Sequence, residues 1–255
     1  MEIEIWNWTA YLWDCLEKMD ELIAEWVKVD AIITDPPYWT TACKWDTVIP
    51  FDKMWERLNK LIKPNWAIVL FGSEPFSSAL RMSNITQYKY DWIWNKVQKS
   101  NFLNAKKQPL RSYENICVFY KKQPTYNFIK TTWHKKKEVK NIERKTVELY
   151  NEQNWIQNYS SIERYPHSVI KFNKDTQKSS LHPTQKPVAL MEYLIKTYSH
   201  KDEVILDFTA GSFSTWVACQ NTNRKFILIE KDETYFNAWV ERINNLINNL
   251  TKWIY

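Results

Sequence analysis

Four consecutive residues, Asp35-Pro36-Pro37-Tyr38, end a short apolar segment and combine groups that can hold a flat amine. The two prolines fix the backbone and offer carbonyl oxygens without competing N–H donors. Asp35 adds a carboxylate acceptor, and Tyr38 adds an aromatic face. A planar group that carries an NH2 would be held by two hydrogen bonds and by stacking. The same four residues could also form a turn without any function. The rest of the sequence therefore decides whether they form a binding site.

Two further acidic residues end apolar segments in the same manner. Asp207 closes the predicted strand 203–207, and Glu230 closes the predicted strand 225–230. Open sheets of parallel strands bind ligands at their carboxyl edge. A single acid at a strand end is most often only a helix cap. Three such acids on one sheet, with Asp35 as the first, favour a shared ligand site.

The elements that would position these acids alternate between short β-branched runs and amphipathic stretches. This alternation is typical of β-α-β units and predicts an α/β fold with a parallel sheet. Helices are expected over 15–27, 51–62, 74–84, 187–199, 213–221 and 232–250. Strands are expected over 30–35, 67–71, 88–94, 115–120, 203–207 and 225–230.

The periodicity is lost between residues 121 and 180, where Asn, Gln, Ser and Lys dominate. We expect this stretch to be an insertion or a small separate lobe. The segments 1–120 and 181–255 would then be two halves of one domain.

Positive charge is concentrated in the segment 96–145, which holds 12 Lys and 2 Arg against 3 Glu, a local charge of +11. Because the formal net charge of the whole chain is +6, the remainder is acidic, at −5. Aromatic residues alternate with these charges, which favours a polyanion such as nucleic acid as the partner. A solvated basic loop would have the same composition.

Composition excludes several classes of protein. A chain of 255 residues that is 44% hydrophobic and 25% charged can bury a real core, so it is neither disordered nor fibrous. It has no apolar run near the roughly 18 residues of a membrane helix, and its acidic start is not a signal peptide. We therefore expect no membrane partner. The four cysteines and four histidines have no metal-ligand or disulfide spacing, which predicts no metal and a reducing, cytoplasmic location.

Glycine and tryptophan occur in abnormal numbers. The chain has 2 Gly and 15 Trp, where average usage would give roughly 18 glycines. Trp13, Trp39 and Trp66 occupy turn positions that usually need tolerance of positive φ. We hypothesise that many tryptophans, Trp216 included, stand at glycine positions of a parent sequence. A naturally aromatic-rich chain is the alternative.

Three ordered motifs resemble those of S-adenosylmethionine-dependent DNA amino-methyltransferases, which act on adenine N6 or cytosine N4. The first is the Asp-Pro-Pro-Tyr segment. The second, residues 207–215 (DFTAGSFST), is similar to the family's cofactor loop, although Phe208-Thr209 replaces the usual Pro-Phe and Phe213 a frequent Gly. The third, residues 182–187 (HPTQKP), resembles the segment before that loop. The order is similar to that of the permuted β group, and the matches span residues 13–231.

The resemblance implies a Rossmann-like, doubly wound, mostly parallel sheet of the class I methyltransferase type. Residues 1–120 would form its catalytic half, 121–180 a target-recognition insertion and 181–255 its cofactor-binding half. Asp35, Pro36 and Pro37 would hold the target amino group, and Tyr38 would stack on the flipped base. S-adenosylmethionine would be bound by Asp14, Cys15, Asp35, Phe71, Thr184, Lys186, Asp207, Phe208, Ala210, Gly211, Ser212, Glu230 and Lys231. DNA would be contacted by Lys106, Lys107, Arg111, Lys135, Lys136 and Lys137.

The activity that the resemblance implies is methylation of adenine N6 in duplex DNA, by direct in-line transfer after base flipping, because relatives with Asp first in the motif usually act on adenine. Cytosine N4 remains the alternative. A catalytically impaired DNA-binding protein is a second hypothesis, since Trp13, Trp39 and Trp216 could block the cofactor cleft. Methylation of RNA or of a protein amide is a weaker third. Double-stranded DNA is the expected partner, and a cognate restriction endonuclease and a homodimer stay open.

Overall fold

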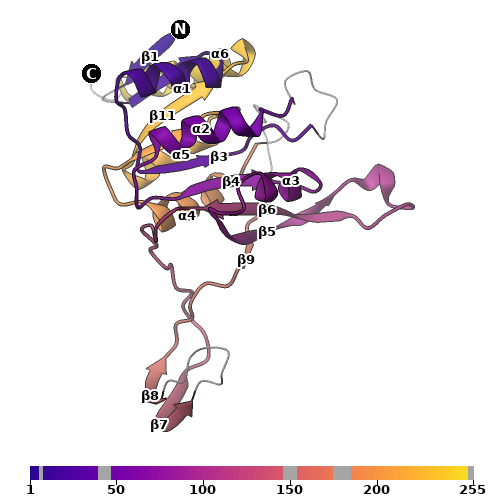
Figure 1. Ribbon diagram of the computed structural model, residues 1–255, viewed down its shortest axis with the longest axis vertical. Coiled ribbons are helices and arrows are strands. Elements are labelled where there is room, and N and C mark those ends of the chain that lie inside the picture. The colour runs from indigo at the N-terminus through magenta and orange to yellow at the C-terminus, as the bar shows by residue number, and fades with distance from the viewer. Residues whose placement is uncertain (6–7, 40–46, 146–153, 175–184, 252–255) are drawn as a thin grey trace. The chain divides into compact units, whose positions relative to one another are not determined.

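The computed structural model describes residues 1–5, 8–39, 47–145, 154–174 and 185–251. The chain divides into two compact units (Figure 1). The main unit comprises Met1–Asn127 and Ser168–Tyr255, and the small unit comprises Phe128–His167.

The main unit is built on one sheet, which has nine strands among the described residues (Figure 1). In spatial order the strands are β1 (Glu2–Ile5), β2 (Trp8–Leu12), β11 (Lys225–Glu230), β10 (Val204–Asp207), β3 (Ala31–Thr34), β4 (Ile68–Gly72), β6 (Arg111–Phe119), β5 (Tyr88–Ser100) and β9 (Val169–Lys171). The five strands from β2 to β4 run parallel, β6 is antiparallel to both its neighbours, and β1 is antiparallel to β2. The predicted, mostly parallel sheet is confirmed.

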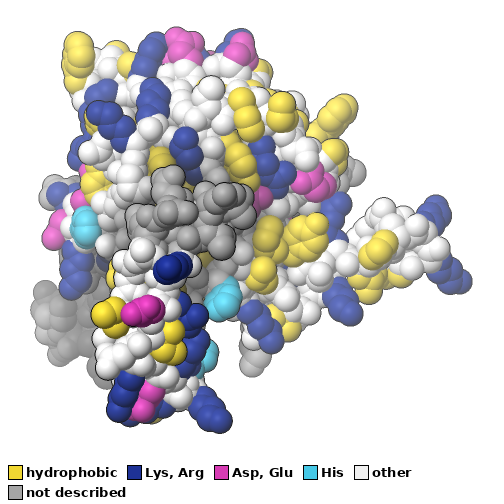
Figure 2. All heavy atoms as spheres, turned by 60° about the horizontal axis from the view of Figure 1, so that its bottom comes forward, with side chains coloured by type: hydrophobic (Ala, Val, Ile, Leu, Met, Phe, Trp, Pro, Cys, Tyr) yellow, Lys and Arg dark blue, Asp and Glu magenta, His cyan; other side chains and the backbone are white. Residues whose placement is uncertain are grey.

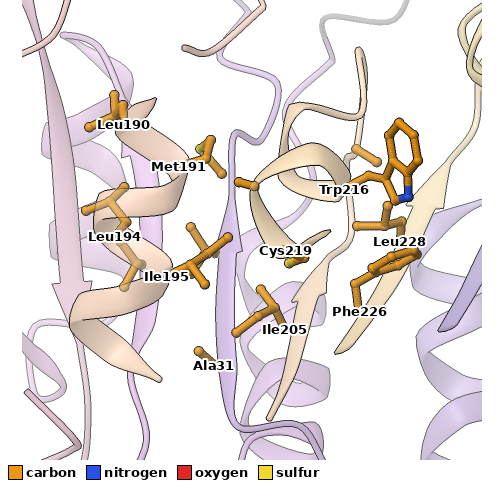
Figure 3. Packing of buried hydrophobic residues seen from close by; sticks show 14 of the residues in the cluster. Ala31, Leu190, Met191, Leu194, Ile195, Ile205, Trp216, Cys219, Phe226 and Leu228 are labelled. Atoms are coloured by element: carbon orange, nitrogen blue, oxygen red, sulfur yellow. The ribbon is translucent and has the colours of Figure 1, made fainter. Parts of the chain in front are cut away.

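Helices cover both faces of this sheet. Helices α1 (Cys15–Ala24), α2 (Phe51–Leu61) and α3 (Phe76–Ser83) pack on one face, and α4 (Val188–Tyr198), α5 (Ser214–Thr222) and α6 (Glu233–Thr251) pack on the other. β3 shows how the sheet separates two cores, because Ile32 joins the first cluster while Ala31 and Ile33 join the second. Figure 3 shows part of the second core, where α4 and α5 lie against the strands. The predicted double winding is therefore confirmed.

The order of connections reverses at the centre of the sheet. From β3 the chain passes through α2 to β4 on one side, and from β10 it passes through α5 to β11 on the other. β3 and β10 are hydrogen-bonded neighbours. Ligands of open α/β sheets bind outside the carboxyl ends of the strands at such a reversal. Thr34 and Asp207, the last residues of β3 and β10, lie at this point.

Helix α1 shows how the sequence sets the ends of an element. Asp14 caps its N-terminus by accepting a hydrogen bond from the Leu16 N–H at 2.9 Å. At the other end, the N–H groups of Val27 and Trp26 donate to the carbonyls of Leu22 and Ile23, at 3.0 and 3.1 Å. This is a Schellman motif, and it places Trp26 at φ 59°, a conformation that favours glycine.

Strands β5 and β6 extend well beyond their predicted ranges of 88–94 and 115–120 and form an arm that projects from the main unit (Figure 1). A short 3-10 helix, η1 (Phe102–Asn104), lies at its tip. The added residues are polar and mostly exposed, so they lack the apolar alternation that a sequence pattern needs. Strands β1, β2 and β9 were not predicted either.

The small unit contains a two-stranded antiparallel sheet, β7 (Lys137–Lys145) and β8 (Asn154–Ser161). The Thr131 and Arg164 backbones exchange hydrogen bonds, and Lys130 pairs with Glu163 at 2.8 Å. Val139 is the one buried residue among those described in this unit. The strands were missed because most of their residues are exposed and no apolar alternation marks one face. The unit lies within the range 121–180 that was expected to be an insertion.

In the part of the chain that the structure describes, no helix combines the length and apolar character of a membrane span.

Candidate active site

A cavity of about 660 Å³ opens at the carboxyl edge of the main unit's sheet. Asp35, Asp207 and Glu230 all line it, so the structure brings the three strand-end acids to one place. The wall is completed by the start of α1, by the loop before α2 and by Arg111 at the base of the arm. An acidic floor under a partly apolar wall suits a ligand with hydroxyls, a cationic group and a flat ring.

Most of the residues predicted to be catalytic or cofactor-binding line this cavity. They are Asp14, Cys15, Asp35, Pro36, Pro37, Tyr38, Lys186, Asp207, Phe208, Ala210, Gly211, Ser212, Glu230 and Lys231. Phe71 does not; it is fully buried in the sheet beneath Lys186, whose ammonium lies 5.2 Å from its ring centroid. Thr184 lies outside the described residues.

The residues predicted to bind DNA lie in different places. Arg111 lines the cavity and donates a hydrogen bond to the Ser73 hydroxyl at 2.8 Å. Lys106 and Lys107 lie at the tip of the arm, and Lys135–Lys137 lie in the small unit.

Asp35 belongs to a buried group of four charges. Its Oδ2 is paired with the Lys186 ammonium, which also lies 3.4 Å from Glu114 Oε2. The other carboxylate oxygen of Glu114 is paired with Lys96. Both lysines are almost fully buried, at 7% and 4% exposure for Lys186 and Lys96. We call Asp35, Lys186, Glu114 and Lys96 the charge tetrad, which is neutral when every member is ionised.

Burial and mutual attraction set the ionisation of the tetrad. Burial raises the pKa of Asp35, which Lys186 opposes and Glu114 reinforces. Burial also opposes the charge of Lys186, but its attraction to Asp35 and Glu114 outweighs burial and raises its pKa. For Glu114 the two lysines outweigh burial, so its pKa is lowered. For Lys96, burial outweighs the attraction to Glu114, so its pKa is lowered.

The Tyr38 hydroxyl donates a hydrogen bond to Asp35 Oδ1, and Lys186 donates one to Oδ2, so both oxygens of that carboxylate have partners. The Tyr38 ring lies against Phe76, with the ring centroids 5.0 Å apart. Each carboxylate oxygen keeps a second lone pair, so an exocyclic amine can bind Asp35 beside these partners or in place of one of them.

Asp207 lies deeper in the site, within a set of hydroxyl donors. Thr34 Oγ1 donates to its Oδ1 at 2.5 Å, and Thr215 Oγ1 donates to its Oδ2. The Thr209 N–H adds a bond of 3.2 Å. Burial still prevails and raises the pKa of Asp207 to about 6. The two threonine hydroxyls were missed by the sequence analysis, although Thr34 directly precedes the Asp-Pro-Pro-Tyr motif.

Glu230 organises the loop that follows β10 and the turn that follows β11. Its carboxylate accepts the N–H groups of Gly211 at 2.6 Å, Lys231 at 2.9 Å and Asp232 at 2.8 Å. Burial raises its pKa despite these bonds. Gly211 has φ 52°, which is the reason for a glycine here. Phe213, where related loops often have glycine, also has positive φ, at 59°.

Asp14 lies beside this turn at the cavity wall. Lys231 lies 3.1 Å from its Oδ2. Burial disfavours the ionised form of Asp14, but hydrogen bonds from Lys231 and the Leu16 N–H outweigh it and lower the pKa. Burial raises the pKa of the neighbouring Cys15 thiol to about 12, so it is protonated at neutral pH and is no nucleophile.

The tryptophans largely leave the cavity open. Trp39 is 80% exposed and does not line the cavity, and Trp216 packs against Trp239 in the core (Figure 3). Trp13 does line it, at its rim. Of the three turn positions predicted to need positive φ, only Trp39 has it, at 56°; Trp13 and Trp66 do not, so that prediction was wrong for them.

The donor set of the cavity fits a nucleoside joined to an amino acid. Asp14 and Glu230 stand at one end, where hydroxyls and a ring amine can be held, and Asp207 stands ready for a cationic amine. Gln185 Oε1 is buried at the cavity wall and has no hydrogen-bond partner among the described residues. Such an unsatisfied acceptor is costly unless a ligand supplies the donor.

Comparisons with known proteins agree with this geometry. Over nearly the whole chain, the sequence is 26% identical to the DNA adenine methyltransferase YhdJ of Escherichia coli (strain K12), with 91% of this chain and 81% of that protein covered. It is also 26% identical to the Type II methyltransferase M1.MboII of Moraxella bovis, covering 93% of this chain and 95% of that protein.

Solved structures show the same fold. The M1.HpyAVI–SAM complex matches with a TM-score of 0.62 and 26% identity, over 91% of this chain and 98% of that one. The cytosine-N4-specific PvuII DNA methyltransferase matches with a TM-score of 0.64 at 16% identity, over 90% of this chain and 83% of that one. The predicted class I methyltransferase fold is thus confirmed. A family model described as N6_N4_Mtase, DNA methylase, matches residues 29–241, and the chain belongs to this family of DNA methyltransferases.

Proposed function

We propose that this protein transfers a methyl group from S-adenosylmethionine, the cofactor of its family, to the N6 amino group of adenine in duplex DNA. The observation that carries the proposal is that Asp35 and Tyr38 share one cavity with Asp14, Asp207 and Glu230. An acceptor for the target amine thus lies in the same space as acceptors for the cofactor. The relative named as a DNA adenine methyltransferase supports adenine as the base.

The chemistry requires positioning more than bond activation by the protein. When bound, S-adenosylmethionine supplies a methyl group on a positively charged sulfur, so neither a metal nor a covalent enzyme intermediate is needed. The exocyclic amine is a poor nucleophile because its lone pair is delocalised into the ring. Asp35 and the Pro36 carbonyl would accept its two hydrogens and direct the lone pair toward the methyl carbon. As the N–C bond forms and the S–C bond breaks, the surplus amine proton passes to the Asp35 carboxylate or to water.

The rest of the cavity is proposed to hold the cofactor. Asp207 would pair with its amino group and Lys186 would approach its carboxylate. Glu230 would accept the ribose hydroxyls, and Asp14 would contact the adenine ring. Thr184 stays a prediction from the resemblance alone. The surrounding residues Cys15, Phe208, Ala210, Gly211, Ser212 and Lys231 would line the same ligand.

Duplex DNA is the proposed partner because the target atom lies inside the base stack and must be flipped out, at a cost of a few kcal/mol. Lys106, Lys107 and Arg111 on the arm, with Lys135–Lys137 of the small unit, would bind phosphates and help offset that cost. The small unit would serve target recognition. We further propose a restriction-modification setting with a cognate endonuclease, which relatives named as Type II methyltransferases support.

The test is methyl transfer from labelled cofactor to unmethylated genomic DNA, followed by digestion to nucleosides and mass spectrometry. We expect N6-methyladenine. Asp35→Ala is expected to lower the rate by about 100-fold or more, even when the cofactor is saturating as measured by calorimetry. N4-methylcytosine without N6-methyladenine would overturn the choice of base. Salt-dependent DNA binding by a folded chain that does not bind the cofactor would identify it as a DNA-binding protein without activity.

A further inference from the structure

The tip of the β5–β6 arm carries two large apolar side chains that no described residue covers. Phe102 is 76% exposed and Leu103 is 83% exposed. The arm pairs Asn95 with Tyr113 and, beyond an irregular stretch, Ser100 with Arg111; residues 101–110 form the turn beyond that last pair. Exposing apolar area on a projecting turn is unfavourable in water, so a pair like this marks an interaction surface.

The turn is ordered by its own hydrogen bonds. Asn101 adopts φ 71°, and its Oδ1 accepts from the Asn104 amide at 2.7 Å. The Asn104 carbonyl then accepts the N–H groups of Lys107 and Gln108, at 2.8 and 3.0 Å. Because these polar residues close the turn on themselves, Phe102 and Leu103 are held outward rather than folded back. A preorganised apolar tip loses little entropy when it binds.

Only positive charge surrounds this tip along the chain. Between Trp92 and Tyr113 the sequence has five Lys or Arg residues and no Asp or Glu. Lys99, Lys106 and Lys107 are exposed. Figure 2 shows the protruding arm with Lys and Arg side chains gathered at its end, beside apolar ones. A polyanion with an apolar interior, rather than an ordinary protein surface, complements this combination.

The base of the arm belongs to the active site. Arg111 and Glu114 line the cavity, and they are three residues apart on β6. The turn therefore starts directly beyond Arg111 and roughly 10 Å along β6 from Glu114, from the rise of a β-strand. This distance is similar to the width of the DNA major groove, about 12 Å. A duplex that delivers a flipped base to Asp35 would thus lie within reach of the tip.

We propose that the arm presses Phe102 and Leu103 as an apolar wedge against the base stack of duplex DNA next to the target nucleotide, while Lys99, Lys106 and Lys107 contact phosphates. The inference rests on the proposed function and adds to it the element that opens the duplex. Apolar side chains inserted between base steps compensate for lost stacking in other DNA-binding proteins. The wedge would fill the space that flipping leaves, and it reads no base sequence.

The experiment compares the full-length protein with the double variant Phe102→Ser/Leu103→Ser by fluorescence anisotropy. The probes are a labelled duplex of mixed sequence and the same duplex with one abasic site, which is cheaper to open. We expect wild type to prefer the abasic duplex. The variant should lose most of that preference and bind the abasic duplex about tenfold more weakly, from the lost burial of two apolar side chains.

Two controls separate the wedge from other effects. Met82→Ser/Ile85→Ser removes a comparable exposed apolar pair at the end of α3, with exposures of 70% and 55%, and should change neither affinity. Lys106→Gln/Lys107→Gln should weaken binding to both duplexes equally. It should also reduce the slope of log affinity against log salt by about 2, since each phosphate contact contributes roughly 0.9 to the slope. The wedge variant should keep the wild-type slope.

The proposal is overturned if the wedge variant binds both duplexes like wild type. It is equally overturned if the variant changes only self-association, measured by sedimentation, because the tip would then contact a second copy of the chain. If wild type transfers no methyl group but shows the arm-dependent preference, the proposed activity fails and the wedge stands. Thermal unfolding of each variant, expected to match wild type for these exposed positions, verifies the fold.

Discussion

Asp35 already accepts hydrogen bonds before any substrate arrives, because Tyr38 donates to one of its oxygens and Lys186 to the other. The Lys186 ammonium thereby holds one acceptor of the carboxylate that we propose for the substrate amine, and it can leave only if its charge is balanced elsewhere. Glu114, 3.4 Å away, is one such partner, and the carboxylate of the cofactor would be another. Lys186 would thus link the proposed cofactor end of the cavity to the proposed target end.

The energetics of this link can be measured with a double-mutant cycle. Lys186→Met leaves Glu114 with Lys96 and removes the ion-pair partner of Asp35, and we expect the free energy of unfolding to fall by about 3 kcal/mol, as for other broken buried ion pairs. Adding Glu114→Gln restores neutrality and should recover most of that loss. Urea unfolding of Lys186→Met, of Glu114→Gln and of the double variant measures both effects. An unchanged midpoint for Lys186→Met would show that the tetrad contributes no stability.

A second residue-scale prediction concerns Asp207, whose pKa is raised to about 6 by burial. A cationic amine pairs with the ionised form only, so binding must first remove the proton below that pH. The dissociation constant of S-adenosylmethionine should therefore be flat above pH 6 and rise up to tenfold per pH unit below it. Calorimetry from pH 5 to 8 measures this profile.

The control for that profile is Asp207→Asn, which cannot titrate. Its binding should be weaker at neutral pH and should lose most of the change below pH 6. Asp35 and Glu230 also have raised pKa values, so any slope that remains in Asp207→Asn belongs to them. A profile identical to wild type would contradict a role for Asp207.

Among the elements, helix α1 shows strain at a single residue. Trp26 has positive φ at the position of its Schellman motif where glycine is usual, and its side chain is 85% exposed. An L-residue with a large side chain pays about 1 kcal/mol or more for this conformation, and an exposed ring recovers little through burial. Buried tryptophans have another cost, because the indole N–H groups of Trp216 and Trp239 find no acceptor among the described residues.

We expect Trp26→Gly to raise the free energy of unfolding by about 1 kcal/mol, because it removes the left-handed strain without removing a core contact. The matched control is Trp66→Gly, at a position without positive φ, where the added chain entropy of glycine should lower stability by a few tenths to 1 kcal/mol. Chemical denaturation of both variants gives the answer. If both variants shift in the same direction, backbone conformation does not explain the effect.

The sequence predicted the elements that bury apolar side chains. β3, β4, β10 and β11 are short, mostly apolar runs that end in turn residues, and their predicted bounds differ from the observed ones by one residue or less. The helices followed from three-and-four spacing of buried residues such as Met19 and Leu22. The outer arm, β7 and β8 bury almost nothing, so they carry no hydrophobic period to detect.

In the site, sequence patterns identified the acidic side chains that line the cavity but not the side chains that pair with them. Asp35, Asp207 and Glu230 were identifiable because each ends a strand at one sheet edge. The pairing of Asp35 with Lys186, 151 residues away, depends on how the segments after the insertion return to the sheet. The same holds for the bond from Thr34 to Asp207, across 173 residues. Such contacts are set by topology, which no local pattern contains.

At the scale of the whole molecule, the main unit has two cores while the small unit has almost none. Among the described residues of the small unit only Val139 is buried, and Trp133, Ile156 and Tyr165 are each more than 60% exposed. A unit with so little buried area derives little stability from packing. Its lysines and exposed rings suit a nucleic acid that would supply the missing contacts.

We therefore expect DNA to protect the small unit from amide hydrogen exchange. Backbone amides of β7 and β8 should exchange fast in the free protein and several-fold more slowly with saturating duplex, whereas those of β3 and β10 should be slow in both states. Mass spectrometry of the exchanged peptides gives the comparison within one sample. Equal exchange of β7 and β8 with and without DNA would remove the small unit from the proposed interface.

The strained end of α1 finally bears on how the gene is decoded. Trp26, Trp39 and Trp133 all have positive φ, and the chain has 15 tryptophans beside 2 glycines. A single codon could be read as tryptophan by one translation system and as glycine by another. Such a difference would alter all the affected tryptophan positions together. Peptide masses of the protein made in its own cells would then show glycine at residue 26, and the helix would end without strain.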